Sequence, residues 1–153
     1  MKIMIAVDDS RNSEFAVEFV TRLRWPAGSR MVAVSALPPA LSPLLISAMP
    51  ADALTVPSVD SVARAEATLQ VHATLEHAET LLRAAGFCTE GRLLEGDPRE
   101  AILSAAEAEH ADLLVLGCHG RSGLAKLLLG SVSSHAVTHA TCSVLVVKAP
   151  AGS

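Results

Sequence analysis

Short apolar stretches alternate with longer amphipathic segments along most of this chain. Five of the short stretches have the length and aliphatic content of strands buried in a sheet: Lys2–Val7, Met31–Leu37, Phe87–Leu94, Asp112–Gly117 and Ser143–Lys148. The segments between them carry apolar residues at helical spacing. Because strands and helices alternate, the pattern predicts a parallel sheet with right-handed crossovers, covered by helices in a three-layer α/β/α sandwich.

Signals at their ends define the first two expected helices. One follows several possible N-cap residues in 8–13 and ends before Trp25 and Pro26, because the position before a proline disfavours helix. The other covers Asp60–Ala85 and stops at Gly86, a typical C′ residue. The apolar residues of this long helix predict a buried stripe of Val62, Leu69, Leu75, Leu81 and Leu82.

Turn residues also precede the last two helices. Asp97 is placed to cap a helix that has Pro98 at its first position. Glu100, three residues after the cap, completes a capping-box arrangement, and this helix is expected to run to about His110. The final helix is expected over Val132–Ala140.

The segment Pro38–Val59 breaks the alternating pattern. It holds five of the eight prolines and one charged residue, Asp52, so regular structure of any length is not expected there. It is also unusually apolar for a solvated loop. Two interpretations stay open: a lid or partner-contact segment, and a loop that folds onto its own domain. The second is slightly favoured, because only a contiguous apolar patch signals a partner.

Composition narrows the class of protein. With 153 residues, half of them apolar and 18% charged, we expect one folded domain over 1–150 and a short tail at 151–153. A net charge of −4 argues against nucleic acid as the main partner. No apolar run reaches membrane-spanning length, and early acidic residues disfavour a secretory signal. Three cysteines without metal-like spacing are typical of free thiols in a reducing cytoplasm.

A glycine-rich segment follows the fourth expected strand. Gly117, Gly120 and Gly130, the last followed by Ser131, leave two and then nine residues between successive glycines. The segment closes on a helix start at Val132, so several backbone N–H groups can face one anion. From the residues alone, phosphate binding and a plain strand-to-helix connection both stay open.

This glycine-serine spacing resembles the nucleotide-binding signature of the ATP-binding branch of the universal stress protein family. The chain start at 3–8 and its close at 142–147 also resemble that family's first and last strands. The resemblance implies a Rossmann-like, adenine-nucleotide-α-hydrolase-like sheet with strand order 3-2-1-4-5. Such an order would place Asp8 and Gly117 across one crevice, at the point where the strand order reverses.

The resemblance also implies bound ATP, with Mg²⁺ or Mn²⁺ screening its phosphates. The implied contacts are Asp8, Ala36, Gly117, Gly120, Gly130, Ser131 and Val132. Asp8 would touch the adenine and ribose end or the metal, although a role as helix cap would also explain it. The base contact at the end of the second strand falls on Ser35 or Ala36, and Ala36 is favoured. Arg121 and Lys126 are the basic side chains near the inferred phosphates; either could pair with them, although a solvated surface position is the more common fate of such a residue.

Some residues depart from the family pattern or suggest other chemistry. Asp9 adds a second negative charge beside Asp8, which would disfavour phosphate unless a cation intervenes. Cys118 replaces a commoner serine or threonine, and a small buried residue is favoured over a redox-sensitive thiol. His135 and His139, four residues apart, lack a third ligand, so a structural or solvated pair is favoured over a metal site.

Together these features predict a cytosolic, nucleotide-dependent sensor or adaptor in the stress response. A fast enzyme is not expected, because neither a general base nor a Ser-His-Asp arrangement is visible. Slow ATP hydrolysis or self-phosphorylation on Ser131 stays open. A dimerisation module without nucleotide is disfavoured by the intact glycine-serine pattern. An α-hydrolase-type enzyme is disfavoured because its Ser-Gly-Gly-x-Asp-Ser loop is missing.

The resemblance further implies a homodimer formed through Ser143–Lys148. This stretch is apolar and would lie at a sheet edge, which is a liability if left unpaired.

Overall fold

The computed structural model describes residues 1–37, 59–119 and 129–150 of the chain. Its strands are β1 (Lys2–Ala6), β2 (Arg30–Leu37), β3 (Cys88–Glu95), β4 (Leu113–Gly117) and β5 (Ser143–Val147). They form one sheet in the order β3-β2-β1-β4-β5, with every neighbouring pair parallel. The predicted strand order is confirmed, and each strand begins and ends within one residue of its expected bounds.

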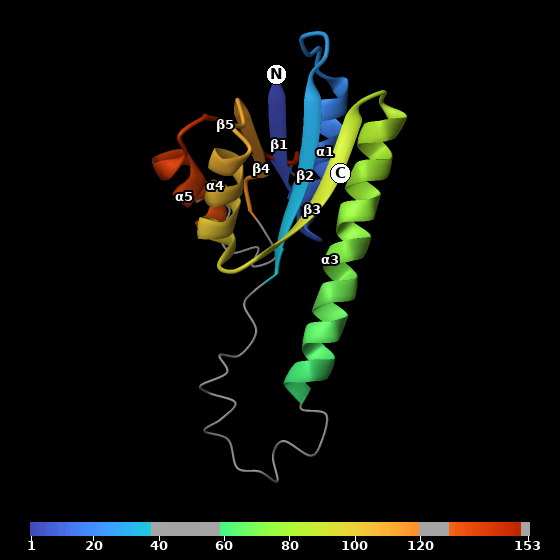
Figure 1. Cartoon of the computed structure of the whole chain (residues 1–153), viewed down its shortest axis with the longest axis vertical. Coiled ribbons are helices and arrows are strands. Elements are labelled where there is room, and N and C mark those ends of the chain that lie inside the picture. Colours follow the sequence, from blue (N-terminus) through green and yellow to red (C-terminus); the bar gives the residue numbers. More distant parts are fainter. Residues whose placement is uncertain (38–58, 120–128, 151–153) are drawn as a thin grey trace.

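Helices cover both faces of this sheet (Figure 1). Within the described residues they are α1 (Arg11–Arg22), α3 (Val59–Ala84), α4 (Pro98–Ala108) and α5 (Ser131–His139). The α/β/α sandwich is therefore confirmed. No helix in the described part of the chain has the length and apolar character needed to cross a bilayer.

The central strand β1 is covered on both faces, so its sequence does not alternate between apolar and polar residues. Ile3 and Ile5 belong to the core on the α1 and α3 side, while Met4 belongs to the core on the α4 and α5 side. All three are fully buried. A strand covered on both faces needs apolar residues at successive positions, and each such buried side chain stabilises the fold by about 1.5 to 3 kcal/mol.

The helix ends follow the predicted signals closely. Gly86 lies in the left-handed region at φ 89°, and Phe87 N donates to Leu82 O at 3.1 Å, which closes α3 in a Schellman arrangement. The same arrangement closes α4, but there the left-handed residue is His110, at φ 50°. Trp25 Nε1 donates to Val20 O at 2.9 Å, so this side chain also satisfies the end of α1.

Two expectations about the helices are wrong. Val62 and Leu69 are 50% and 71% exposed, so the predicted stripe on α3 is buried only in its C-terminal half. The reason is visible in Figure 1, where the first part of α3 extends past the sheet. The side chains of α3 that are buried are Val71, Leu75, Ala78 and Leu82.

The capping box before α4 also differs from expectation. Asp97 caps the helix through the N–H of Arg99, at 2.9 Å. Glu100 points elsewhere, with Oε1 3.1 Å from His135 Nε2 on α5. The acidic residue expected to cap α4 therefore pairs with the neighbouring helix. The apolar segment 38–58, and with it both interpretations of its role, lies outside the described residues.

Candidate functional site

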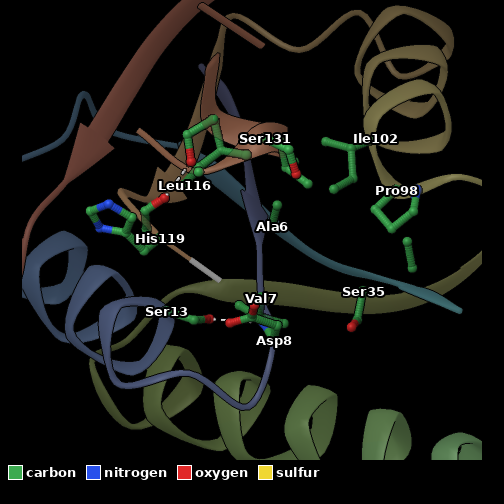
Figure 2. Close-up of a pocket in the computed structure, with 15 residues that line it drawn as sticks. Ala6, Val7, Asp8, Ser13, Ser35, Pro98, Ile102, Leu116, His119 and Ser131 are labelled. Carbon is green, nitrogen blue, oxygen red and sulfur yellow. Dashed lines mark hydrogen bonds between the residues drawn. The ribbon is translucent and has the colours of Figure 1, made fainter. Parts of the chain in front are cut away.

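A cavity of about 280 Å³ opens at the carboxyl ends of the central strands. Its walls come from the ends of β1, β2 and β4 and from the starts of α1, α4 and α5. Figure 2 shows the lining side chains, which are Ala6, Val7, Asp8, Ser13, Ser35, Ala36, Pro98, Ile102, Leu116, Gly117, His119, Gly130, Ser131, Val132 and Ser133. In the sheet, β1 lies between β2 and β4, and the strand order reverses between β1 and β4. The cavity lies at this point, which is the ligand-binding position of open α/β sheets.

The turn after β1 holds Asp8 in a fixed position. Asp8 Oδ1 accepts hydrogen bonds from Ser10 N at 3.0 Å and from Ser10 Oγ at 2.5 Å, and Asp8 N donates to Ser13 Oγ at 2.9 Å. Ser10 is the N-cap of α1, and its hydroxyl accepts from Ser13 N. The helix cap is therefore Ser10, and Asp8 anchors that cap while lining the cavity.

Gly117, at the end of β4, is required by close packing. A Cβ at this position would lie 2.8 Å from the backbone carbon of Asn12 and 3.0 Å from Asn12 Cβ. The first turn of α1 thus occupies the space that a side chain would need. Ser133 Oγ donates to Gly117 O at 2.7 Å, which ties the end of β4 to the first turn of α5. At Gly117 the missing Cβ therefore serves helix packing.

The N-terminus of α5 differs from those of α1 and α4. Ser10 and Asp97 cap α1 and α4 with their side chains, but Gly130 at the N-cap of α5 provides no such bond. The first turn of α5 also contains no acidic residue. Gly130 N donates to Cys118 O at 2.8 Å, which holds this helix start beside β4. Helix N-terminal N–H groups carry partial positive charge and attract anions.

The opposite wall comes from β2 and α4 and is mostly apolar. Ala36, Pro98 and Ile102 line it, together with the buried Ser35. Next to Pro98, the side chain of Arg99 and then its backbone N–H lower the pKa of the Asp97 carboxyl to about 2. Asp97 therefore stays ionised, and keeps α4 capped, far below neutral pH.

Residues at the start of the glycine segment contact α1. Cys118 Sγ lies 3.4 Å from Asn12 Oδ1 and 3.2 Å from His119 Nδ1. Cys118 is buried, as expected of a small core residue. Asn12 Oδ1 also accepts from Ala149 N at 3.2 Å, so one side chain joins α1, β4 and the chain after β5. His119 Nε2 is buried and finds no hydrogen-bond partner among the residues that the structure describes.

Six of the residues expected at the site line this one cavity: Asp8, Ala36, Gly117, Gly130, Ser131 and Val132. Gly120 and Arg121, like Lys126, lie outside the described residues. Ser13, Ile102, His119 and Ser133 also line the cavity, and the sequence did not predict them there. Ser133 could have been found, because the first turn of a helix that opens on a binding loop faces the preceding strand end. Ile102 and Ser13 offered no signal beyond helical periodicity.

The two histidines of α5 lie side by side, with His139 exposed. The rings of His135 and His139 have centroids 4.5 Å apart, and His135 pairs with Glu100 as described above. Across the described ranges, no cluster of three or more His, Cys, Asp or Glu side chains could hold a metal ion on its own.

The sheet order and the position of the cavity define a doubly wound α/β protein with a cavity at its switch point. The chain belongs to the universal stress protein family, because its sequence matches the model of that family over residues 1–148. A universal stress protein of Methanocaldococcus jannaschii is 48% identical over 58 residues. That match covers 38% of this chain and 34% of the relative, so the chain matches about a third of the relative's length.

Solved structures share the fold over nearly the whole chain. The protein MJ0577 of Methanocaldococcus jannaschii superposes with a TM-score of 0.77 at 23% identity, covering 99% of this chain and 97% of that one. A universal stress protein solved in complex with cAMP has a TM-score of 0.64 at 26% identity, covering 96% and 95% of the two chains.

Proposed function

We propose that this protein binds ATP, together with a divalent cation, in the cavity at the carboxyl edge of the sheet. In this proposal it acts as a nucleotide-dependent sensor or adaptor in the stress response. The observation that carries the proposal is the N-terminus of α5, which opens on the cavity without a side-chain cap. The other two helices that begin at this cavity have such a cap.

The start of α5 offers what a phosphate group requires. The N–H groups of its first turn point out of the helix, and Gly130, Ser131 and Val132 all line the cavity. Because the first turn carries no carboxylate, nothing in it repels an anion. The Ser131 hydroxyl adds one further donor. The family member solved with cAMP, which superposes on 96% of this chain, supports a purine nucleotide as the ligand.

Asp8 is the residue that would hold the proposed cation. It is the acidic side chain among the residues that line the cavity. Because one of its oxygens is already held by Ser10, the carboxylate is fixed in place and would repel phosphate without a cation between them. A phosphate-bound Mg²⁺ or Mn²⁺ needs only one or two carboxylates from the protein.

The cavity favours binding over rapid catalysis. His119 Nδ1 faces Cys118 Sγ, its Nε2 is buried away from solvent, and Asp8 Oδ1 is engaged by Ser10, so none of these three atoms is poised to activate a water molecule. Slow hydrolysis, or phosphorylation of Ser131 by bound ATP, remains compatible with this arrangement. We further propose that the protein works in the cytoplasm.

We also propose that the protein forms a homodimer through β5. This strand lies at the edge of the sheet and pairs with β4 on one side. Its residues Val144, Leu145 and Val146 are only half-buried, so a second copy would cover apolar surface. Sedimentation of wild type and Val146→Arg would test this: a dimer that becomes a monomer supports the interface, and a wild-type monomer contradicts it.

Calorimetric titration of nucleotide-free protein with ATP, with and without Mg²⁺, tests the binding proposal. We expect a double variant, Gly130→Ala with Ser131→Ala, to lose affinity, and the exposed Ser134→Ala on the same helix to keep it. Asp8→Asn preserves an oxygen for Ser10 but removes the charge, so its ATP affinity should depend less on Mg²⁺. Folded wild type that binds no ATP would instead support a structural dimerisation module.

A further inference from the structure

The side chain of Asn12, in the first turn of α1, contacts parts of the chain that are far away in sequence. Its Oδ1 accepts from Ala149 N, after β5, at 3.2 Å, and Cys118 Sγ, after β4, lies 3.4 Å from the same oxygen. Its Nδ2 donates to His119 O at 3.3 Å. The helix itself does not need Asn12 as a cap, because Ser10 already serves as one.

An amide matches the two backbone partners of Asn12. The N–H of Ala149 needs an acceptor, whereas the carbonyl of His119 needs a donor, and neither backbone group can exchange its role. A carboxamide supplies an oxygen and an NH2 group on one planar fork, so it satisfies both partners at once. An ionised carboxylate offers no donor to His119 O, and a hydrocarbon side chain offers neither donor nor acceptor. These contacts therefore favour asparagine over ionised or apolar residues of similar size.

Asn12 is the donor that holds the His119 carbonyl. Ser10 Oγ also lies 3.3 Å from His119 O, but a hydroxyl has a single proton, and Ser10 Oγ lies only 2.5 Å from the carboxylate oxygen Asp8 Oδ1. The shorter bond to a charged acceptor engages that proton. The bond from Asn12 Nδ2 is then the one that fixes His119 O.

Holding this carbonyl fixes one wall of the cavity. The preceding carbonyl, Cys118 O, accepts from Gly130 N at 2.8 Å. Two successive carbonyls after β4 therefore bind different helices, because Cys118 O contacts the start of α5 and His119 O contacts the first turn of α1. Figure 2 shows His119 on one side of the cavity and Pro98 on the other. The start of α5 and the turn that carries Asp8 are thus held at a fixed separation.

We propose that Asn12 is a positioning residue of the proposed nucleotide site, which keeps the start of α5 and Asp8 at the separation that nucleotide and cation require. The inference rests on the proposed function and adds a residue that is not among those lining the cavity in the described part of the chain. Groups that are already held in place need not be ordered by the ligand, so less free energy is lost on binding. Asn12 acts through His119 and does not contact the ligand.

The test compares the ATP affinity of Asn12→Leu, Asn12→Asp and wild type, measured by calorimetry with Mg²⁺. Leucine removes both bonds at nearly the same volume, and Asn12→Leu should weaken ATP binding about 5- to 10-fold, the scale of one hydrogen bond. Trp25→Phe is the matched control, because it removes the side-chain bond to Val20 O at the other end of α1. It should lower the melting temperature, as Asn12→Leu does, but leave the ATP affinity unchanged.

The pH profile of Asn12→Asp separates positioning from a merely structural role. At neutral pH the introduced carboxylate has no proton for His119 O, so ATP should bind at least as weakly as in Asn12→Leu. The protonated acid has a donor and an acceptor, as the amide does. Affinity relative to wild type at the same pH should therefore recover in Asn12→Asp as the pH falls towards about 4, near the ordinary aspartate pKa, but not in Asn12→Leu. Cys118 and His119, which contact this position, and the nearby Asp8 are unchanged in both variants.

Three outcomes would overturn the inference. If Asn12→Leu binds ATP as tightly as wild type, any weakening in Asn12→Asp comes from its charge alone. An equal loss of affinity in Trp25→Phe would mean that destabilising α1 is sufficient, and an Asn12→Asp variant that does not recover in acid would contradict the role of the donor. Asn12→Ala removes the same two bonds without added bulk and replaces the leucine variant if that does not fold. Wild type that binds no ATP would instead overturn the proposed function itself.

Discussion

The amino edge of the sheet, where the strands begin, and the carboxyl edge, where they end, differ in how their polar groups are paired. At the amino edge, Glu109 pairs with Lys2 at 3.0 Å and with Arg92, which in turn pairs with Glu90 at 2.8 Å. At the carboxyl edge, α5 begins at the cavity without a side-chain cap for its backbone N–H groups. Because unsatisfied polar groups destabilise a fold, the comparison indicates which edge is shaped for a ligand and which for stability.

The largest effect on stability is expected at the carboxyl edge, from Gly117→Ala. The added Cβ would meet the backbone of Asn12 at 2.8 Å, so α1 must shift away from β4. We expect a loss of about 2 kcal/mol in the free energy of unfolding, measured by denaturant titration. Gly28→Ala is the control: its φ of 77° is strained for alanine but no atom lies within 4 Å, so it should lose only about 1 kcal/mol. Equal losses would contradict this account of Gly117.

A smaller effect of opposite sign is expected at the amino edge, where His110 closes α4 in the left-handed region at φ 50°. Glycine adopts this conformation without a Cβ penalty, so His110→Gly should stabilise the protein by about 0.5 to 1 kcal/mol. Denaturant titration measures the gain, and calorimetry should show unchanged ATP affinity. A variant that is less stable would mean that the imidazole makes a contact worth more than the strain.

The smallest effect at neutral pH is expected from Glu109→Gln, because its partners Lys2 and Arg92 are about one third or more exposed. Lys2, and then Arg92, lower the pKa of Glu109 below its ordinary value of 4.5. A carboxyl group with a lowered pKa stabilises the folded state at pH values above its ordinary pKa. This stabilisation is lost as the pH falls through the lowered pKa. The difference in melting temperature between wild type and variant should therefore shrink below pH 4.5. A difference that persists in acid would contradict this assignment.

Much of the fold could be predicted from the sequence because its signals are local. Continuous apolar runs such as Ile3–Val7 require burial on both faces, and Gly86 marked the end of α3 correctly. The prediction that Val62 and Leu69 are buried on α3 was wrong, because helical periodicity does not reveal how far a helix extends beyond the sheet that it covers.

The candidate site was predicted only in part, for a similar reason. Asp8 and Gly117 follow strand ends, and the topology brings such positions together. The partner of Ser133 is a carbonyl 16 residues away, and the place of Ile102 in the cavity wall depends on how α4 packs against the sheet. Neither property is encoded in residue spacing, so both required the three-dimensional structure.

The most direct test of the central claim is thermal unfolding of wild type and Gly130→Asp, each with and without ATP and Mg²⁺. Gly130 has φ −61° and ψ 161°, a conformation that an N-cap aspartate adopts. The account predicts that this carboxylate raises the melting temperature of the free protein by capping α5, while excluding phosphate. ATP should therefore stabilise wild type, by about 2.7 kcal/mol at a hundredfold excess over Kd, and leave the variant unchanged. Wild type that does not respond to ATP, or a variant that responds equally, would contradict the claim.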